Sequence, residues 1–282
     1  MSSPLRSRER AAQATPADPP PVYFDARTEL AARFLAGEGL EIGPLHLPLK
    51  LPSQARARYV DRMPVEQLRE EYPELAGWDL TPVDVVDDGE QLTTVAAESQ
   101  DFIVANHFLE HCEDPIGTIA THLGRLRPGG VLFYAVPDKR YTFDFRRPVT
   151  PLEHMLADHD EGPERSRREH YDEWAELVVF EEGEPAEERR ARARRLEAEG
   201  YSIHMHVWTQ AEFLALLLAA RERLGEAFEL EAAARQGIEV VVVLRKRGPL
   251  QKPAAGPSGG RLRELATKLK RRGRAVLRRA RG

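Results

Sequence analysis

Short apolar runs recur along the first half of the chain, and each ends at a polar residue or a glycine. The runs are too short for helices and rich in Val, Ile and Phe, which is typical of strands that are buried on both faces. Amphipathic or charged stretches separate them. We therefore predict strands at residues 40–43, 58–61, 83–86, 101–105 and 131–136.

Local signals mark where the intervening helices begin. Asp114 can cap a helix whose first turn holds Pro115, and Thr209 can cap another. The turn Arg235-Gln236-Gly237 joins two further apolar runs and predicts a hairpin. The predicted helices are residues 27–36, 65–72, 115–126 and 213–224, and the predicted hairpin strands are residues 228–233 and 238–244.

Strands that alternate with helices predict a parallel sheet. We expect an α/β fold: a Rossmann-like, doubly wound, mostly parallel sheet with a terminal antiparallel hairpin. The regular pattern breaks at residues 138–207, which we interpret as a helical insert, or lid, over the sheet. Within it, residues 181–200 are charged and Ala-rich and predict a solvated helix.

The ends of the chain differ in composition from its middle. We divide the chain into a flexible Pro-rich arm (1–22), one domain (23–247), a linker (248–260) and a basic segment (261–282). The 282 residues carry a net charge of −5, yet the basic segment has ten Lys or Arg and one Glu. The domain is therefore strongly acidic, which argues against a general nucleic-acid partner.

The basic segment has two interpretations. Its few bulky apolar residues are spaced nearly as in a helix, which suits an interfacial helix on anionic lipid, but a disordered basic tail explains it equally well. The chain has a single cysteine, lacks a long apolar run and has no apolar signal region at its start. We expect a cytoplasmic protein, with peripheral contact to the inner membrane face as a further hypothesis.

Acidic residues stand at the ends of the first three predicted strands. In a doubly wound sheet, ligands bind outside these carboxyl ends. Glu41 and Gly43 follow the first strand, Asp61 the second and Asp88 the third, where neighbouring Asp87 is expected to be solvated. A diphosphate would be repelled there, whereas a cationic nucleoside with a ribose diol would be favoured.

Several segments together resemble successive motifs of class I S-adenosyl-L-methionine (SAM)-dependent methyltransferases of the type 11-like group. The resemblance spans about residues 38–137, and residues 209–245 are similar to the family's last helix and hairpin. A narrower resemblance, to bacterial methyltransferases associated with glycosyltransferases, is carried by Val136-Pro137-Asp138-Lys139-Arg140-Tyr141 and the His-rich insert. The motifs of the broader resemblance are Leu40-Glu41-Ile42-Gly43, Asp61, Val86-Asp87-Asp88-Gly89-Glu90, the run from Gln100 to His111, and Leu126-Arg127-Pro128-Gly129-Gly130.

This resemblance implies SAM as cofactor and assigns a role to each strand end. Glu41 and Gly43 would border the methionine moiety and Asp61 would hold the ribose hydroxyls. Asp88 would hold the adenine amine with Gly89 beside the ring, and Asn106 would lie near the sulfonium. One departure stands out: the family has two or three glycines in its first motif, whereas here Gly43 is followed by Pro44-Leu45-His46-Leu47-Pro48. The first loop must therefore have a different shape.

Histidines at the fourth strand end and in the insert are the candidate catalytic residues. A hydroxyl acceptor must lose a proton, and His is suited to accept it near neutral pH. Our candidates are His107, His170 and His204; the alternative is that they are ordinary polar residues of the lid. His204 and His206, with His154, His159 or Asp158, also raise the question of a metal, but no tight ligand motif is present and we expect none.

The resulting prediction is a SAM-dependent methyltransferase that O-methylates a sugar or a glycan-linked small molecule. The rivals are a methyltransferase for a secondary metabolite or another acceptor, and a non-catalytic methyltransferase-like scaffold in glycan assembly. A base methyltransferase is disfavoured because the fourth strand ends in Asn106-His107-Phe108-Leu109, without the Pro-Pro-aromatic signature of that class.

Overall fold

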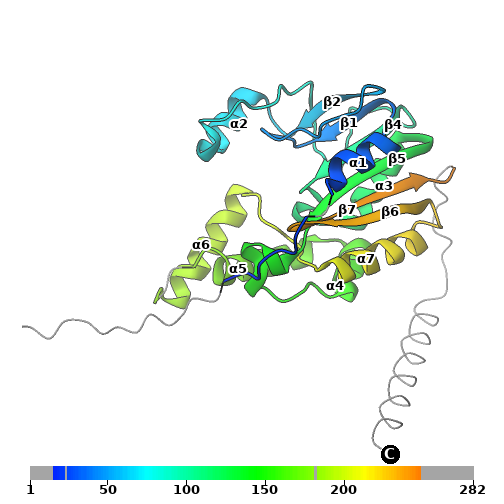
Figure 1. Ribbon diagram of the computed structural model, residues 1–282. Helices are drawn as coiled ribbons and strands as arrows, with labels where there is room; N and C mark the ends of the chain where they lie inside the picture. The colour runs from blue at the N-terminus through cyan, green and yellow to red at the C-terminus, as the bar shows by residue number, and fades with distance from the viewer. Residues whose placement is uncertain (1–14, 23, 181–182, 249–282) are drawn as a thin grey trace, which may run out of the picture. The chain divides into compact units, whose positions relative to one another are not determined.

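The computed structural model describes residues 15–22, 24–180 and 183–248. Its centre is a seven-stranded sheet with the order β3-β2-β1-β4-β5-β7-β6 (Figure 1). The first five strands run parallel, and the hairpin of β6 and β7 adds two antiparallel strands beside β5. The strands are β1 (Gly37–Ile42), β2 (Ala55–Asp61), β3 (Val85–Val86), β4 (Gln100–Asn106), β5 (Leu126–Pro137), β6 (Phe228–Gln236) and β7 (Glu239–Lys246). The predicted Rossmann-like fold is confirmed.

The two faces of the sheet bury separate cores, because successive side chains of a strand point to opposite faces. Helix α1 (Ala26–Phe34) covers one face, where Phe102 and Val104 are fully buried. Helices α3 (Pro115–Arg125) and α7 (Gln210–Arg223) cover the other, over Ile103 and Ala105. This double cover explains why β4 is an unbroken apolar run in the sequence.

The predicted helix starts are present. The Asp114 carboxylate accepts a hydrogen bond from Gly117 N at 2.8 Å at the start of α3. Thr209 and Glu212 form a reciprocal capping box at the start of α7. Helix α2 (Val65–Glu71) begins after Pro64, without a side-chain cap. These local signals needed no tertiary contact to be recognised.

Two local expectations are wrong. Arg127-Pro128-Gly129-Gly130 has the Pro-Gly-Gly composition that is typical of a turn, yet it lies within β5, where the pairing register with β4 shifts between Gln100 and Phe102. A bulge accommodates the proline, which cannot donate to the ladder. Asp87 is 8% exposed rather than solvated, and its carboxylate accepts from the backbone and hydroxyl groups of Thr93 and Thr94.

The connection from β1 to β2 contains no helix. Residues 43–54 cross between these parallel strands as a loop, in which Gly43 (φ +60°) and Leu45 (φ +48°) both adopt left-handed backbone. Pro44 separates them, and its carbonyl accepts from Leu47 N at 2.8 Å. The single-glycine motif thus makes a differently shaped loop, as its sequence indicates.

The insert is more helical than predicted. Besides the expected α6 (Ala186–Glu199), it contains α4 (Leu152–Glu161) and α5 (Glu164–Leu177), and α5 and α6 lie side by side (Figure 1). Short 3₁₀ turns precede α4. Residues 200–209 lead from α6 to α7 as an extended segment. The 3₁₀ turns of the chain are η1 (Pro73–Leu75), η2 (Leu109–His111), η3 (Lys139–Tyr141) and η4 (Phe143–Arg146).

The predicted terminal segments are described only in part. Of the arm 1–22, residues 15–22 are described, and Ala17 N donates to the carbonyl of Arg140 at 2.9 Å. The basic segment 261–282 and nearly all of the linker lie outside the described residues, so lipid contact stays a prediction. Among the described helices, none combines the length and apolarity that crossing a bilayer requires.

Candidate active site

The first four strands place their carboxyl ends along one edge of the sheet. The parallel register pairs Glu41 with Tyr59 and with Val104, and Asp61 with Val86. Glu41, Asp61, Asp88 and Asn106 therefore follow neighbouring strands. The structure brings these four predicted cofactor-binding residues to the same edge, which is the ligand-binding edge of doubly wound sheets.

Glu41 anchors the first loop and keeps one oxygen free. Its Oε1 accepts from Leu49 N at 2.8 Å, which ties the loop back to β1. Its Oε2 is buried and has no hydrogen-bond partner among the described residues. Burial raises the pKa of Glu41 to about 7, against the lowering effects of the Leu49 N–H and of Arg27. A cationic donor at Oε2 would hold this carboxylate ionised.

Asn106 ends β4 with both side-chain polar atoms buried. Neither Oδ1 nor Nδ2 has a hydrogen-bond partner among the described residues. Buried amide groups in native proteins are almost always hydrogen-bonded, so an orphaned pair marks a place where a ligand or solvent completes the site. This is the clearest such mark on the cofactor edge.

Asp61 and Asp88 are more open. Asp61 Oδ1 accepts from Arg62 N at 2.7 Å, and partial burial raises the pKa of Asp61. Asp88 is exposed, with its Oδ1 accepting from Glu90 N at 2.8 Å. Each carboxylate already orders its own backbone and still has a second oxygen with which to accept from a hydroxyl or an amine.

The glycines of this edge have distinct roles. A Cβ at Gly89 would lie 2.6 Å from Phe108 and 2.7 Å from Ile42, so only glycine fits this close approach. A Cβ at Gly43 would meet nothing within 4 Å, which shows open space beside the first loop. The backbone at Gly43 is therefore accessible, and the wall at Gly89 is tightly packed.

These residues fit SAM. A buried free carboxylate oxygen at Glu41 and an orphaned amide at Asn106 call for polar ligand atoms, and the carboxylate acceptors suit the donor groups of an ammonium, a ribose diol and an adenine amine. We infer that Glu41, Gly43 and Asn106 would hold the methionine end and the sulfonium, and Asp61, Asp88 and Gly89 the adenosine end. These roles follow the resemblance and stay predictions.

His107 lies between two carboxylates. Its Nε2 is 2.8 Å from Glu239 Oε2, and its Nδ1 forms an ion pair with Glu110 Oε1 at 3.4 Å. Burial opposes its charge, but the neighbouring carboxylates of Glu110 and Glu239 prevail and raise the pKa of His107 to about 9. His107 is therefore cationic at neutral pH, which is the wrong state for the general base that the sequence suggested.

His204 also pairs with a buried carboxylate, that of Asp144. Its Nδ1 is 2.6 Å from Asp144 Oδ2. The fully buried Arg147 holds this pair in place: it donates to Asp144 Oδ1 at 3.0 Å and to the carbonyl of His204 at 2.7 Å. The ring of His204 also contacts His111 at 4.6 Å between centroids. Because a carboxylate only accepts, the contact with Asp144 places a proton on Nδ1 of His204, so that in the neutral ring Nε2 is the acceptor.

His170 is not next to His204 but belongs to a separate cluster. Its Nε2 lies 3.1 Å from His154 Nε2, and its ring lies 4.9 Å from that of His206. Burial, followed by the charges of the neighbouring imidazoles, lowers the pKa of His170 to about 3. Of the three histidines predicted as catalytic, His107 and His204 both lie beside Glu110, whereas His170 belongs to a different cluster.

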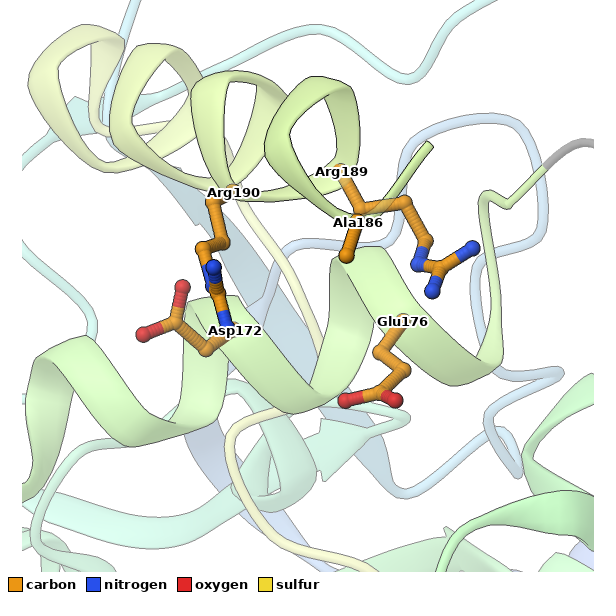
Figure 2. A pocket seen from close by; sticks show the side chains of 5 residues that line it. All are labelled: Asp172, Glu176, Ala186, Arg189 and Arg190. Carbon is orange, nitrogen blue, oxygen red and sulfur yellow. The ribbon is translucent and has the colours of Figure 1, made fainter. Parts of the chain in front are cut away.

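A pocket between α5 and α6 is unrelated to this edge (Figure 2). Its lining is dominated by exposed or half-exposed charged side chains of the two insert helices, and none of them follows a strand. Such a charged surface hollow lacks the apolar lining of cofactor sites. The lining residues are Asp172, Glu176, Ala186, Arg189 and Arg190.

The carboxylates that orient these histidines could not be identified from the sequence. Asp144 lies 60 residues from His204 along the chain, and Glu239 lies 132 residues from His107. No local spacing could join them. Glu110 is buried, and its carboxylate oxygens have no hydrogen-bond partner among the described residues. Its sequence position is equally compatible with an active role and with a role at the start of a helix.

We compared the chain with known proteins. The profile of a methyltransferase-domain family matches residues 21–221. A search among curated proteins found no match. Solved structures share the fold at low identity, and this chain spans about half the length of the CurJ protein, which stands first among them.

Three of these structures are methyltransferases. The CurJ carbon methyltransferase is 12% identical, with 76% of this chain and 49% of that chain covered and a TM-score of 0.40. A SAM-dependent methyltransferase from Aquifex aeolicus is 13% identical, with 77% and 86% covered and a TM-score of 0.41. The N-methyltransferase NodS from Bradyrhizobium japonicum, in complex with S-adenosyl-L-homocysteine, is 17% identical, with 76% and 80% covered and a TM-score of 0.38.

At these scores the structural likenesses carry nothing beyond the fold, and the family match carries the assignment. It covers well over half of the chain and includes every strand end described above except those of the final hairpin. The chain therefore belongs to the methyltransferase-domain family, and it is a SAM-dependent methyltransferase.

Proposed function

We propose that the protein transfers the methyl group of SAM to a hydroxyl of a sugar or of a glycan-linked small molecule. The observation that carries this proposal is the buried pair of His204 and Asp144 beside the exposed ring of Phe143. Bound SAM supplies an electrophilic methyl group on its sulfonium. The residues of the chain must then orient the acceptor and take up the proton that a hydroxyl loses on transfer.

His204 is prepared to accept that proton. A carboxylate only accepts hydrogen bonds, so the 2.6 Å contact with Asp144 requires a proton on Nδ1 of His204. The neutral ring then presents an unprotonated Nε2, and Asp144 stabilises the positive charge that develops when Nε2 takes the proton. Arg147 orients both partners, since it binds the Asp144 carboxylate and the His204 carbonyl.

An aromatic surface adjoins this pair. Phe143 is 52% exposed, and its ring lies 4.9 Å from that of His204 and 5.5 Å from that of Trp174. A sugar ring has an apolar C–H face that packs on an aromatic ring and hydroxyls that need polar partners. Phe143 offers the first and His204 with Asp144 the second. This combination supports a sugar-like acceptor over a purely apolar one.

The test is an acceptor screen with SAM and a panel of nucleotide sugars and simple glycosides, read by release of S-adenosyl-L-homocysteine and by mass spectrometry of the acceptor. We expect His204→Asn to lower kcat by about 10²–10⁴-fold while SAM affinity in calorimetry stays unchanged. The matched control is His159→Ala, because His159 pairs with Asp114, away from Asp144.

Two results would contradict the proposal. One is methyl transfer to nitrogen or carbon acceptors with none to hydroxyls. The other is full kcat in His204→Asn for a hydroxyl acceptor that the wild type methylates. Either result leaves the SAM-dependent activity in place and rejects only the acceptor class.

A further inference from the structure

Four side chains converge inside the insert, away from the His204 pair. His154 Nε2 lies 3.1 Å from His170 Nε2 and 3.1 Å from Asp158 Oδ2, and His206 Nε2 lies 3.3 Å from Asp158 Oδ2. The coordinating atoms of all four residues lie within 4.8 Å of one another. Three imidazole nitrogens and one carboxylate oxygen thus point to a common centre.

The hydrogen bonds of His206 make this convergence informative. Its Nδ1 lies 3.0 Å from the carbonyl of Cys112, which only accepts, so Nδ1 carries a proton. In a neutral ring Nε2 then has only a lone pair, yet it faces the carboxylate oxygen of Asp158 at 3.3 Å. Two acceptors face each other, and a cation between them resolves the conflict.

The spacing fits a coordinated metal ion. Zn²⁺ binds imidazole nitrogen at about 2.0–2.1 Å and carboxylate oxygen at about 2.0–2.2 Å, so neighbouring ligands of a tetrahedral site are about 3.4 Å apart. The three contacts given above, at 3.1, 3.1 and 3.3 Å, are close to that value. The other three pairs of ligand atoms lie within 4.8 Å of one another, so an ion would draw those side chains inward.

Outer groups orient two of the four side chains. The Cys112 carbonyl fixes the His206 ring with Nε2 inward, and Ser166 Oγ donates to Asp158 Oδ1 at 2.7 Å, which leaves Oδ2 for the centre. Such second contacts are what metal ligands typically have. His206, Asp158 and His170 are all 8% exposed or less, so the centre is also sheltered from solvent.

We propose that His154, Asp158, His170 and His206 form a binding site for one divalent transition-metal ion, with Zn²⁺ as the best match. The ligands come from α4, α5 and the extended segment 200–209. The ion therefore fastens three parts of the insert together. From the sequence we expect no metal, and this proposal replaces that expectation.

A neighbouring group of Glu110, His111 and His204 is the weaker candidate. Its coordinating atoms also lie within 4.8 Å of one another. However, Nδ1 of His111 is within 3.1 Å of both the Ile203 carbonyl and Ser202 Oγ, and Nδ1 of His204 is bound to Asp144. It offers one carboxylate and two imidazoles, one fewer ligand than the proposed site, and it serves as an alternative outcome of the test.

The experiment measures metal binding by the full chain, with any affinity tag removed and bound metal stripped by a chelator. Zn²⁺ is titrated by calorimetry and Co²⁺ by visible absorption, which is intense for tetrahedral Co²⁺. We expect one ion per chain, a tetrahedral Co²⁺ spectrum and a higher Tm in the presence of Zn²⁺. Neither SAM nor an acceptor is needed, so this result is independent of the methyl-transfer assays.

Variants locate the ion. His154→Ala removes the most exposed ligand, with a side chain 26% exposed, and is expected to weaken Zn²⁺ binding by at least about 100-fold. Ser166→Ala loosens only Asp158 and should weaken binding by about 10–100-fold. His159→Ala, on the same helix but paired with Asp114, is the matched control and should bind Zn²⁺ as the wild type does.

Three results would overturn the proposal. The first is no Zn²⁺ or Co²⁺ binding by a wild-type sample whose circular dichroism shows it folded. The second is unchanged affinity in both His154→Ala and His170→Gln. The third is binding that survives those variants and is lost in His111→Asn, which would place the ion in the neighbouring group.

Discussion

The buried polar groups of the cofactor edge and those of the Arg147 network in the insert differ in how they are satisfied. At the strand ends, Glu41 and Asn106 bury polar atoms that have no hydrogen-bond partner among the described residues. In the insert, Arg147 is buried just as deeply, but its guanidinium binds Asp144, Glu173 and two backbone carbonyls. The edge is incomplete without a ligand, whereas this part of the insert is complete within the fold.

This difference indicates what each region does. Buried polar groups that are satisfied internally contribute to stability and hold side chains in one geometry. Buried polar groups left unsatisfied cost stability and are retained where a ligand satisfies them. Substitutions in the insert should therefore affect the free energy of unfolding first, and substitutions at the strand ends should affect ligand affinity first.

The largest expected effect comes from Arg147. Arg147→Leu leaves Asp144 buried without its cationic partner and should lower the free energy of unfolding by about 3–5 kcal/mol in denaturant titrations. The control is the adjacent, exposed Arg146, whose guanidinium lies over the rings of Phe145 and Phe180; Arg146→Leu should change stability by about 1 kcal/mol or less. Equal losses of unfolding free energy in the two variants would contradict the difference between the two regions.

Asp61 tests the cofactor edge. Asp61→Ala should weaken binding of SAM and S-adenosyl-L-homocysteine by about 1–3 kcal/mol in calorimetry, because the ribose hydroxyls lose a charged acceptor. Its stability should stay within about 0.5 kcal/mol of the wild type, since the chain itself makes little use of this carboxylate. The exposed Asp79→Ala serves as control. Unchanged affinity would reject the assigned role of Asp61.

His107 follows β4 at the strand-end edge and pairs with Glu110 and Glu239, and its effect should be the smallest. Its pKa is raised to about 9 in the folded protein against an ordinary value of 6.5. Its contribution is thus fully present below pH 6.5 and is lost as the pH rises through 9. With a side chain 36% exposed, the loss should be about 1 kcal/mol. Urea unfolding across this range should show the decline in the wild type, and a slope equally steep in His107→Gln would contradict it.

Local chemistry made much of the fold predictable. Asp114, Pro115 and the Thr209 capping box start helices through contacts a few residues away, so the sequence alone reveals them. The strand ends were equally predictable from the sequence, because a run of apolar residues followed by Glu41, Asp61 or Asn106 can be recognised without knowledge of tertiary contacts. The cofactor edge follows from topology once the strands are recognised.

The insert was not predictable in the same way. Helix α5 is dominated by charged residues, and much of what holds it is distant in sequence, such as the hydrogen bond from Tyr171 to the carbonyl of Tyr201. His206 and Asp158 are 48 residues apart, and the sequence offers both as possible metal ligands without selecting Asp158 over its neighbours. Side-chain pairs of this kind depend on how helices pack, which local patterns do not encode.

The insert also has its own small hydrophobic core, which determines how easily it opens. Tyr171, Trp174 and Ala193 are buried with Ile203 in a cluster separate from both cores of the sheet. Such a satellite core makes α5 and α6 a cooperative unit that opens at a lower free energy than the whole domain. Amide protons of these helices should exchange with solvent well before those of β4. Transient opening of this unit would leave the sheet and its cofactor edge intact.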